Sequence, residues 1–558
     1  MKRILTLLFI SVFAFCEAQI SNDFTPVSWE VQNMDGVAPV VMPSVDLDAL
    51  RKEDEVNDKR KDIPYRFGYE FLVDYNLANS GSWQTLDNGD RIWRIRFYSE
   101  GAKSMNFVFS DFYMPEGASL CLYSNDRKDV LGAYDEKQNN PERVLGTWLV
   151  TGDDIWLEYY EPKAQKNKGK LELYKLIHGY RTSNDILKNT NDLGSAGNCH
   201  YDVNCTMGSG IDDLKDINKK SVAMIIVGGG LCTGALINNT NNDGTPYFLT
   251  ANHCYQSSGG TSSPSGWAFR FNWISTSPSC ATYGGSISNS DFHTVSGAQL
   301  KANRIGSDFC LVQITGPIDP NWGLIYAGWD RSVTAPTKTF GIHHPAGDIM
   351  KVSLDNNTPS STVTQVQSYG DVQVWEIASW DKGVTEGGSS GSPLFDNNGR
   401  IRGQLLGGDS ECNLNTQTWE TTTQSNGLGD VYGRFNVSWN TGGSSSSRLK
   451  DWLDPSGTNV MMLDYYDGTL GLDNIAAPVN TIKVYPNPSN GVFTVQFANT
   501  VSSLQYEVYN VLGQVVKNGK VTQSNNSIDL SNYTNGIYIL RTVNADTNSV
   551  YSQKIVKR

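Results

Sequence analysis

Eight residues, Glu386-Gly-Gly-Ser-Ser-Gly-Ser-Pro393, have the composition expected of a nucleophile on a tight turn. Glycines let the backbone approach a substrate carbonyl closely and aim N–H groups at it. Taken alone the pattern is weak, because Ser and Gly runs usually form ordinary turns, and Ser444–Ser447 is another such run. A catalytic interpretation therefore needs a base, an orienting acid and a scaffold elsewhere in the chain.

Among the six histidines, His253 is the best candidate for the base. It follows the apolar run Tyr247-Phe-Leu-Thr-Ala, which predicts a strand that closes at the histidine, and a polar hairpin separates this strand from another over 231–237. A bridge between Cys232 and Cys254 would stabilise the pair by roughly 3 kcal/mol in the chain-entropy model. It would also hold the imidazole at one angle, as a general base requires. The alternative, a core histidine, is less favoured.

An acid must set the tautomer of the histidine and stabilise the imidazolium. Asp308 enters the apolar run 309–314, and a carboxylate about to be buried needs a partner. Asp291 and Asp319 lie in polar loops and are expected to be solvated. The candidate catalytic residues thus occur in the order His253, Asp308, Ser390.

The whole chain narrows the class of protein. At 558 residues it is too long for one core, and two to four domains are expected. A net charge of −13 argues against binding nucleic acid or an anionic membrane surface. Abundant Gly, Asn, Ser and Thr with many aromatic residues indicate a mainly β protein built of strands and turns.

Residues 1–18 are predicted to be a signal peptide. Lys2 and Arg3 precede an apolar run over 4–15, which is too short for a membrane anchor, and cleavage is expected before Gln19. A lipoprotein signal at Cys16 fits poorly, because of the aromatic residues before it. Seven of the eight later cysteines lie between 199 and 412, as expected for a chain that works in an oxidising compartment.

The rest of the chain divides by composition. Residues 19 to about 60 are polar and charged, which predicts a solvated lead-in. Alternating runs from 65 to 160 predict a small antiparallel β-sandwich, and residues 182–198 have linker composition. A strand-rich region extends to about 466, a second linker covers 467–480, and 481–558 predict a sandwich of seven or eight strands.

With these residues in place, the motifs T-A-x-H-C, S-D-F and G-x-S-G-x-P resemble the trypsin-like serine proteases. Longer strings resemble the lysyl-endopeptidase type of secreted bacterial protease; they cover 341–348, 383–395, 403–408 and 447–455. The resemblance covers 194–466 and implies a double six-stranded β-barrel. The 19–193 region resembles that family's propeptide. The motifs V-Y-P-N-P, V-x-N-x-x-G and N-G-x-Y in 481–558 resemble the C-terminal sorting domain of the type IX secretion system.

The resemblance implies a mechanism. Ser390 would attack the scissile carbonyl, His253 would transfer the proton to the leaving amine, and Asp308 would orient His253. Backbone N–H groups of Gly388 and Ser390 would form the oxyanion hole. No cofactor and no metal are implied, and His343 and His344 are interpreted as part of a structural loop because no third ligand is spaced nearby.

Specificity rests on a different residue from the one trypsin uses. The position six residues before the nucleophile, where trypsin-like enzymes carry a carboxylate for basic substrates, is Val384. The lysyl-endopeptidase type is similar in its D-x-Y-G-R motif, which Asp430-Val-Tyr-Gly-Arg434 matches. Asp430 is therefore predicted to pair with a substrate lysine. An aspartate in an ordinary turn, and a preference for arginine, both stay open.

Two positions depart from the pattern. Ser389 stands where trypsin-like enzymes carry an Asp that pairs with a new N-terminus, so activation is expected to require removal of the propeptide. Leu406 stands where close relatives tend to carry His, which could alter rate or pH profile. The family's disulfides would be Cys199–Cys412, Cys205–Cys280 and Cys232–Cys254, with Cys310 in the core and Cys121 left over in the propeptide.

These expectations define a secreted serine endopeptidase that reaches the cell surface or exterior through the periplasm. Its expected partners are protein substrates, its own propeptide and the type IX machinery, and it is expected to be a monomer. The rival hypothesis is a surface-binding homologue that has lost catalysis.

Overall fold

The computed structural model describes residues 24–558, apart from 32–33, 35, 182–195, 258–259, 262, 284–285, 289–291, 367–369, 416–419, 468–482, 497–502, 511–513, 523 and 545–549. The predicted signal peptide and most of both predicted linkers lie outside the described residues. The chain forms two compact units, Met1–Leu463 and Asp464–Arg558. Strands dominate both, which confirms the mainly β prediction. No helix in the described part of the chain is long and apolar enough to cross a membrane.

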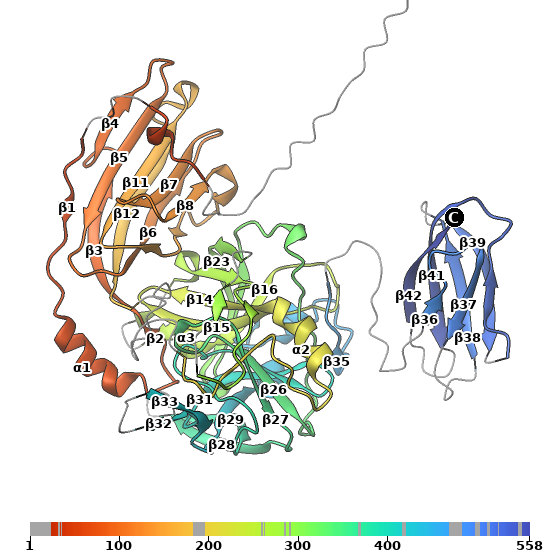
Figure 1. The fold of residues 1–558 in the computed structure, drawn as a ribbon. Helices are drawn as coiled ribbons and strands as arrows, with labels where there is room; N and C mark the ends of the chain where they lie inside the picture. The colour runs from red at the N-terminus through yellow and green to blue at the C-terminus, as the bar shows by residue number, and fades with distance from the viewer. Residues whose placement is uncertain are drawn as a thin grey trace, which may run out of the picture. The chain divides into compact units, whose positions relative to one another are not determined.

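The first unit begins with a β-sandwich (Figure 1). One sheet has the order β1 (Val40–Val41), β5 (Arg91–Tyr98), β11 (Asp154–Glu161), β7 (Ser119–Ser124) and β8 (Val130–Tyr134), with β4 (Ser82–Thr85) paired to β5. The other has the order β10 (Val150–Thr151), β6 (Ser104–Tyr113), β12 (Lys170–Gly179) and β3 (Gly68–Asn76), with β9 (Leu145–Gly146) paired to β6. Alternating apolar side chains meet between the sheets, where the rings of Phe97 and Phe107 lie 5.7 Å apart.

The polar stretch before residue 60 is largely exposed, as predicted, but it contains the helix α1 (Leu47–Asn57), which the sequence did not predict. Asp54 on this helix is buried. Its carboxylate lies 2.7 Å from a guanidinium nitrogen of Arg66 and 2.6 Å from one of Arg181, and it accepts a hydrogen bond from the hydroxyl of Tyr180 at 2.6 Å. These partners lie next to the sandwich strands, so a charge that predicts solvent exposure instead fixes the helix in place.

The region after the sandwich contains two larger sheets. The first has the order β22 (His293–Ser296), β19 (Ala268–Phe271), β14 (Val222–Val227), β15 (Gly230–Leu236), β16 (Tyr247–Ala251), β24 (Phe309–Ile314) and β23 (Ala298–Arg304). Its remaining strand, β2 (Tyr65–Arg66), comes from the N-terminal region and pairs antiparallel with β15. Two small hairpins extend from this region, β17 (Gln256–Ser257) with β18 (Gly260–Thr261) and β20 (Ser275–Ser277) with β21 (Ile287–Ser288).

The second sheet has the order β13 (Tyr201–Asp202), β27 (Lys351–Asp355), β26 (Thr339–His343), β30 (Pro393–Asp396), β31 (Ile401–Gly408), β34 (Asp430–Arg434), β29 (Gly370–Ile377) and β28 (Ser360–Val366). β25 (Trp329–Asp330) pairs with β31 and with β35 (Met462–Leu463), and β32 (Cys412–Asn415) forms a ribbon with β33 (Glu420–Ser425). Short helices α2 (Asp212–Asn218), α3 (Asn252–Tyr255), α4 (Phe435–Asn440) and α5 (Lys450–Leu453) connect the strands.

The two large sheets share one apolar core. Ala235 and Phe309 from the first sheet belong to the same buried cluster as Phe340 and Phe395 from the second. Loops from both sheets therefore meet at a fixed distance, which is the condition for a site assembled from residues far apart in sequence.

The second unit is a separate sandwich with its own core. One sheet contains β36 (Lys483–Tyr485), β37 (Val492–Gln496) and β40 (Ser527–Asp529). The other contains β39 (Val515–Thr522), β38 (Ser503–Tyr509), β41 (Gly536–Asn544) and β42 (Val550–Lys557). Phe493, Val508, Leu540 and Ile555 are fully buried between them.

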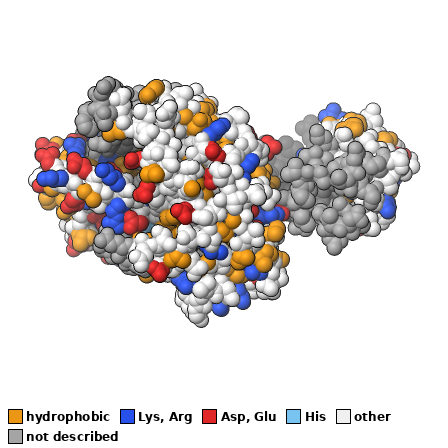
Figure 2. Space-filling model, turned by 90° about the horizontal axis from the view of Figure 1, so that it is seen from below, with side chains coloured by type: hydrophobic (Ala, Val, Ile, Leu, Met, Phe, Trp, Pro, Cys, Tyr) orange, Lys and Arg blue, Asp and Glu red, His pale blue; other side chains and the backbone are white. Residues whose placement is uncertain are grey.

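Acidic and basic side chains are interspersed over the face of the molecule shown in Figure 2. The described residues on that face include no continuous basic surface of the kind that binds nucleic acid.

Candidate active site

Ser390 lies in the loop that leads into β30, between two glycines with positive φ. The angle φ is +92° at Gly388 and +81° at Gly391, a region that L side chains rarely adopt. A Cβ atom at Gly391 would lie 2.2 Å from the hydroxyl of Thr250, and one at Gly388 would lie 2.9 Å from the carbonyl oxygen of His344. Both glycines are therefore required for this loop to pack against its neighbours.

His253 lies on α3, the single helical turn that directly follows β16, so the strand ends at Ala251 and not at the histidine as the sequence predicts. Its Nδ1 is 2.8 Å from Oδ2 of Asp308, and its backbone N–H donates to Oδ1 at 3.0 Å. Asp308 itself has φ of +51°, which is uncommon outside glycine. The two-point contact assigns a proton to Nδ1 and leaves Nε2 as the acceptor.

The carboxylate of Asp308 is fully buried. Burial raises the pKa of Asp308, whereas the adjacent charge of His253 and the hydrogen bonds from it act in the opposite direction. The ionised carboxylate therefore depends on the imidazole beside it, and it can stabilise an imidazolium in return.

The three expected cysteine pairs are disulfide-bonded. Cα–Cα distances are 5.5 Å for Cys199–Cys412, 5.8 Å for Cys205–Cys280 and 6.3 Å for Cys232–Cys254. Cys310 and Cys121 are free and buried. The third bridge joins β15 to the helical turn of His253, so it anchors the base as the sequence predicts.

Asp430 begins β34 and lies at the bottom of a buried polar pocket. It accepts hydrogen bonds from the Trp380 indole at 2.6 Å, the Thr385 hydroxyl at 2.9 Å and the Ser410 hydroxyl at 2.6 Å. All three donors leave the carboxylate charged, and a buried charge requires a counter-ion. The pocket is therefore built for a cation.

That cation is present, and it belongs to the N-terminal region of the same chain. The ammonium of Lys61 lies 2.8 Å from Asp430, and it donates to the carbonyl oxygen of Ser410 at 2.6 Å and to its hydroxyl at 3.0 Å. The Ser390 hydroxyl donates to the carbonyl oxygen of Lys61 at 2.7 Å. One lysine thus spans the distance from the candidate nucleophile to the pocket acid.

The structure brings His253 together with Asp308, but it does not join Ser390 to His253 by a hydrogen bond. Nε2 of His253 is buried without a hydrogen-bond partner. Within the described parts of the chain, the backbone N–H groups of Gly388 and Ser390 also donate to no acceptor. The base and the candidate oxyanion donors are thus available, while the serine hydroxyl is engaged elsewhere.

A second polar network supports the nucleophile loop from behind, and sequence reasoning did not find it. Nδ1 of His343 lies 2.8 Å from the hydroxyl of Ser389, and its Nε2 lies 3.0 Å from that of Ser353. Burial lowers the pKa of His343 well below its usual range, so the ring is neutral. Ser389 thus has a neutral partner at the position where trypsin-like enzymes use a carboxylate.

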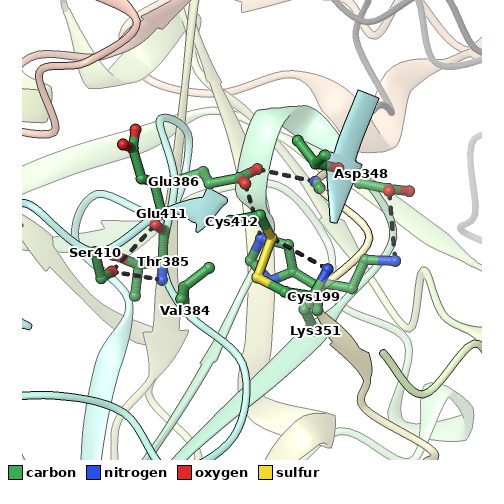
Figure 3. A network of polar contacts seen from close by, with 12 residues as sticks. Cys199, Asp348, Lys351, Val384, Thr385, Glu386, Ser410, Glu411 and Cys412 are labelled. Atoms are coloured by element: carbon green, nitrogen blue, oxygen red, sulfur yellow. Dashed lines mark hydrogen bonds and ion pairs between the residues drawn. A yellow bond between two sulfur atoms is a disulfide. The ribbon is translucent and has the colours of Figure 1, made fainter. Parts of the chain in front are cut away.

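Glu386, at the start of the same loop, pairs with His200 at 3.3 Å. Its carboxylate also accepts the backbone N–H of Gly197 at 3.3 Å, close to the Cys199–Cys412 disulfide. Figure 3 shows Glu386 next to this disulfide, and Ser410 bonded to Thr385. These contacts join the start of the predicted protease region to the nucleophile loop.

The histidines offer no plausible metal site among the described residues. The two groups with ligand-like spacing are Cys232, His253 and Cys254, and His200, Glu386 and Cys412. Each includes a cysteine that is disulfide-bonded and so supplies no thiolate. His344, in turn, lies with Nδ1 2.9 Å from the carbonyl oxygen of Asp348, as expected for a structural loop.

Leu406 is buried in a small apolar cluster with Val366, Val372 and Val374. It also lines a groove of about 570 Å³, together with the segment Lys59–Asp62 and Asp430. Leu406 is thus an apolar part of the groove wall in this chain.

Two family models match the chain. Residues 193–427 match the C-terminal domain of lysyl endopeptidase, and residues 483–558 match a secretion system C-terminal sorting domain. These matches confirm the resemblance that the motifs indicate. The sorting domain marks the chain for export to the cell surface or exterior.

The individual proteins to which this chain is similar have low sequence identity to it. A lysyl endopeptidase of Pseudomonas aeruginosa is 28% identical over 279 residues, which is 48% of this chain and 58% of that protein. An ulvan lyase of Nonlabens ulvanivorans is 34% identical over 89 residues, 16% of each chain. The solved structure of the Rv3671c protease in its inactive form has 15% identity, a TM-score of 0.22, and coverage of 34% of this chain and 80% of that one.

Proposed function

We propose that residues 194–466 form a secreted serine endopeptidase that hydrolyses peptide bonds on the carboxyl side of lysine. The observation that supports this most directly is the placement of Lys61. Its ammonium lies on Asp430 while its carbonyl oxygen lies at the Ser390 hydroxyl. A substrate lysine in the same position would present its carbonyl carbon to the nucleophile.

The proposed reaction uses only groups of this chain. Ser390 Oγ attacks the carbonyl carbon, and Nε2 of His253 accepts the serine proton and passes it to the leaving amine. The backbone N–H groups of Gly388 and Ser390 stabilise the tetrahedral oxyanion, where losing one donor typically costs about 10²–10³ in rate. Water then releases the acyl group by the same steps in reverse.

The geometry of the pocket favours lysine over arginine. Three oxygens converge on the single nitrogen of Lys61: one from Asp430 and two from Ser410. An ammonium has three N–H donors on one atom, whereas a guanidinium spreads its five over a planar fork. The acceptors therefore suit the compact cation.

We assign the remaining regions to the life of this enzyme. Residues 19–193 act as a propeptide, 467–480 as a linker and 481–558 as the signal for the type IX machinery. The mature protease acts as a monomer on protein and peptide substrates. A surface-binding homologue without catalysis is less well supported, because all three candidate catalytic residues are present and His253 pairs with Asp308.

Replacing the nucleophile tests the proposal. Ser390→Ala removes the attacking oxygen, so hydrolysis of a lysyl substrate should fall by about 10⁴-fold or more while the protein still folds. The matched control is Ser445→Ala, in the exposed serine-rich run. Mass-spectrometric mapping of one digested protein reports the residue before each cut. Wild-type activity in Ser390→Ala, or cuts without preference for lysine, would contradict the assignment.

A further inference from the structure

We propose that Lys59–Asp62 is a built-in pseudosubstrate, with Lys61 in the specificity pocket as its anchor. This inference rests on the proposed function, since it assigns an occupant to the same site. It goes further by naming the residue through which the N-terminal region keeps the enzyme inactive.

The burial of Lys61 supports this role. Only 5% of its side chain is exposed, and the side chain of Asp430 is fully buried. The two residues are 369 positions apart in sequence, so the contact cannot result from local chain geometry. A lysine is almost never buried this deeply without a specific counter-ion.

The chain before Lys61 is held by α1. The carboxylate of Asp54 binds Arg66, Arg181 and Tyr180, all of which are outside the helix. Because only a few residues separate α1 from Lys61, these contacts limit how far the pseudosubstrate can move away from the cleft.

The residues after Lys61 are held by the first large sheet, which contains β15. In β2, Tyr65 pairs with Leu231 and Arg66 pairs with Gly230. The backbone N–H of Phe67 continues this contact by donating to the carbonyl oxygen of Gly229 at 2.9 Å. Added-strand pairing of this kind is a common way to hold a peptide against an enzyme.

The same strand reaches the nucleophile loop. A Cβ atom at Gly387 would lie 2.6 Å from the ring of Tyr65, so the ring packs directly on that loop. The guanidinium of Arg181 covers Tyr65 at 4.6 Å from the ring centroid. The pseudosubstrate is therefore anchored on both sides of the peptide bond that follows Lys61.

The arrangement at the reacting groups is substrate-like but unproductive. The Ser390 hydroxyl donates to the carbonyl oxygen of Lys61, whereas catalysis needs it to donate to His253. In the described structure no backbone N–H of Gly388 or Ser390 bonds to the Lys61 oxygen, so the oxyanion hole is not used. The segment blocks the cleft without entering the reaction geometry.

Asp62 adds a charge next to the base. Its carboxylate accepts hydrogen bonds from Arg60 at 3.0 and 2.8 Å. Burial by itself would raise the pKa of Asp62, but Arg60 and the charge of His253 together lower it. The residue after Lys61 therefore places a negative charge near the candidate base.

A peptide-binding experiment on the full chain tests this role. In the Ser390→Ala background, which cannot cut itself, binding of a fluorescent peptide with one lysine is measured by anisotropy. Lys61→Ala should open the pocket and tighten binding roughly 10²-fold, as expected for removal of a buried ion-pair competitor. Lys61→Met, which keeps side-chain length without charge, should do the same if the ammonium is the anchor. Lys170→Ala, at an exposed position of β12 outside this segment and groove, is the matched control and should bind like its parent.

Two outcomes separate this inference from the proposed function. If both Lys61 variants fold with unchanged melting curves but gain no binding, while the processed wild-type enzyme cuts after lysine, the pseudosubstrate is wrong and the function stands. If the processed enzyme does not cut after lysine, the proposed function itself fails. Equal gains for the peptide and for its norleucine analogue would also overturn the role given to the ammonium.

Discussion

The surroundings of Asp430 explain why its pocket requires a cation. Three neutral donors, from Trp380, Thr385 and Ser410, satisfy its oxygens but leave its charge unbalanced. In this structure Lys61 supplies the balancing charge. The proposed preference for lysine would thus arise from the cost of a buried unpaired carboxylate, which a neutral substrate side chain cannot remove.

Asp430→Asn keeps the shape of the pocket but removes its charge. We expect kcat/KM for a lysyl ester to fall about 10²–10³-fold, because one partner of a buried ion pair is lost. Steady-state kinetics on the processed enzyme measures this, with melting curves to show that folding persists. The control is Asp409→Asn, an exposed neighbour, which should change little. An unchanged preference for lysine would place the specificity elsewhere.

Residue types and order were enough to single out candidate residues, whose catalytic roles stay a proposal. The pairing of His253 with Asp308 is in the structure, and Asp430 lies in a pocket with a lysine bound. Lys61 could not be predicted, because the charged run around it has the composition of a solvated segment. Its role depends on a contact between distant parts of the chain, and periodicity carries no information about that.

Two small elements, α1 and β2, decide where the inhibitory segment lies. Neither would be stable alone, since α1 has few apolar residues and β2 is two residues long. They are stabilised by tertiary contacts, α1 through Asp54 and β2 through β15. Their marginal local stability makes this part of the chain sensitive to single changes.

Asp54→Ala should loosen α1, because Arg66 and Arg181 lose a buried carboxylate. Breaking a buried ion pair from one side typically costs about 3–5 kcal/mol. Thermal unfolding of the full chain in the Ser390→Ala background should show this loss, and limited proteolysis should cut faster near residues 57–62. Glu53→Ala is the control, because that side chain is 61% exposed and contacts Arg66 from outside. Equal effects of both variants would argue against a special role for Asp54.

Strands were predictable where apolar residues alternate, as in β37, because a sheet buries one face. The helix α1 was not predicted, because its sequence is dominated by charges. The observed end of β16 also differs from the predicted end, because the turn after Ala251 depends on the contact of Asp308 with the backbone.

At the scale of the molecule, buried histidines link stability to pH. Burial lowers the pKa of His178 and that of His344 to about 4. In the unfolded chain these groups titrate near pH 6.5, so between about pH 6.5 and 4 the unfolded state binds more protons. Their contribution is fully present above about pH 6.5 and is lost as the pH falls, by roughly 1.4 kcal/mol per pH unit for each group.

We therefore expect the melting temperature of the Ser390→Ala chain to fall between pH 7 and pH 5, before the carboxylates titrate. His178→Gln removes one titrating group, so the dependence of the melting temperature on pH should become shallower by about the contribution of one histidine. Calorimetry across the pH range measures the slope. Glu172→Gln, an exposed position on the same strand β12, should leave the slope above pH 5 unchanged. An identical slope in His178→Gln would show that burial of this ring does not set the dependence.

The composition of the sequence indicates where the chain divides better than it indicates which parts pack together. A change in composition near residue 467 lies close to the boundary of the two compact units at Asp464. The sandwich, by contrast, shares its buried cluster with Met224 and Leu231 of the first protease sheet. Composition shows where a chain is loosely packed, but not which of its parts associate.

The pseudosubstrate is covalently part of the enzyme that it blocks. As long as the chain is intact, its effective concentration at the cleft is fixed by the tether, on the order of millimolar or above. External substrate must therefore compete with the pseudosubstrate at this fixed local concentration, whatever the concentration of the enzyme. Once the connection between the sandwich and the protease is cut, the same contact becomes an encounter between two molecules. Dilution then favours release, so export from a crowded envelope into the surrounding medium would itself complete activation.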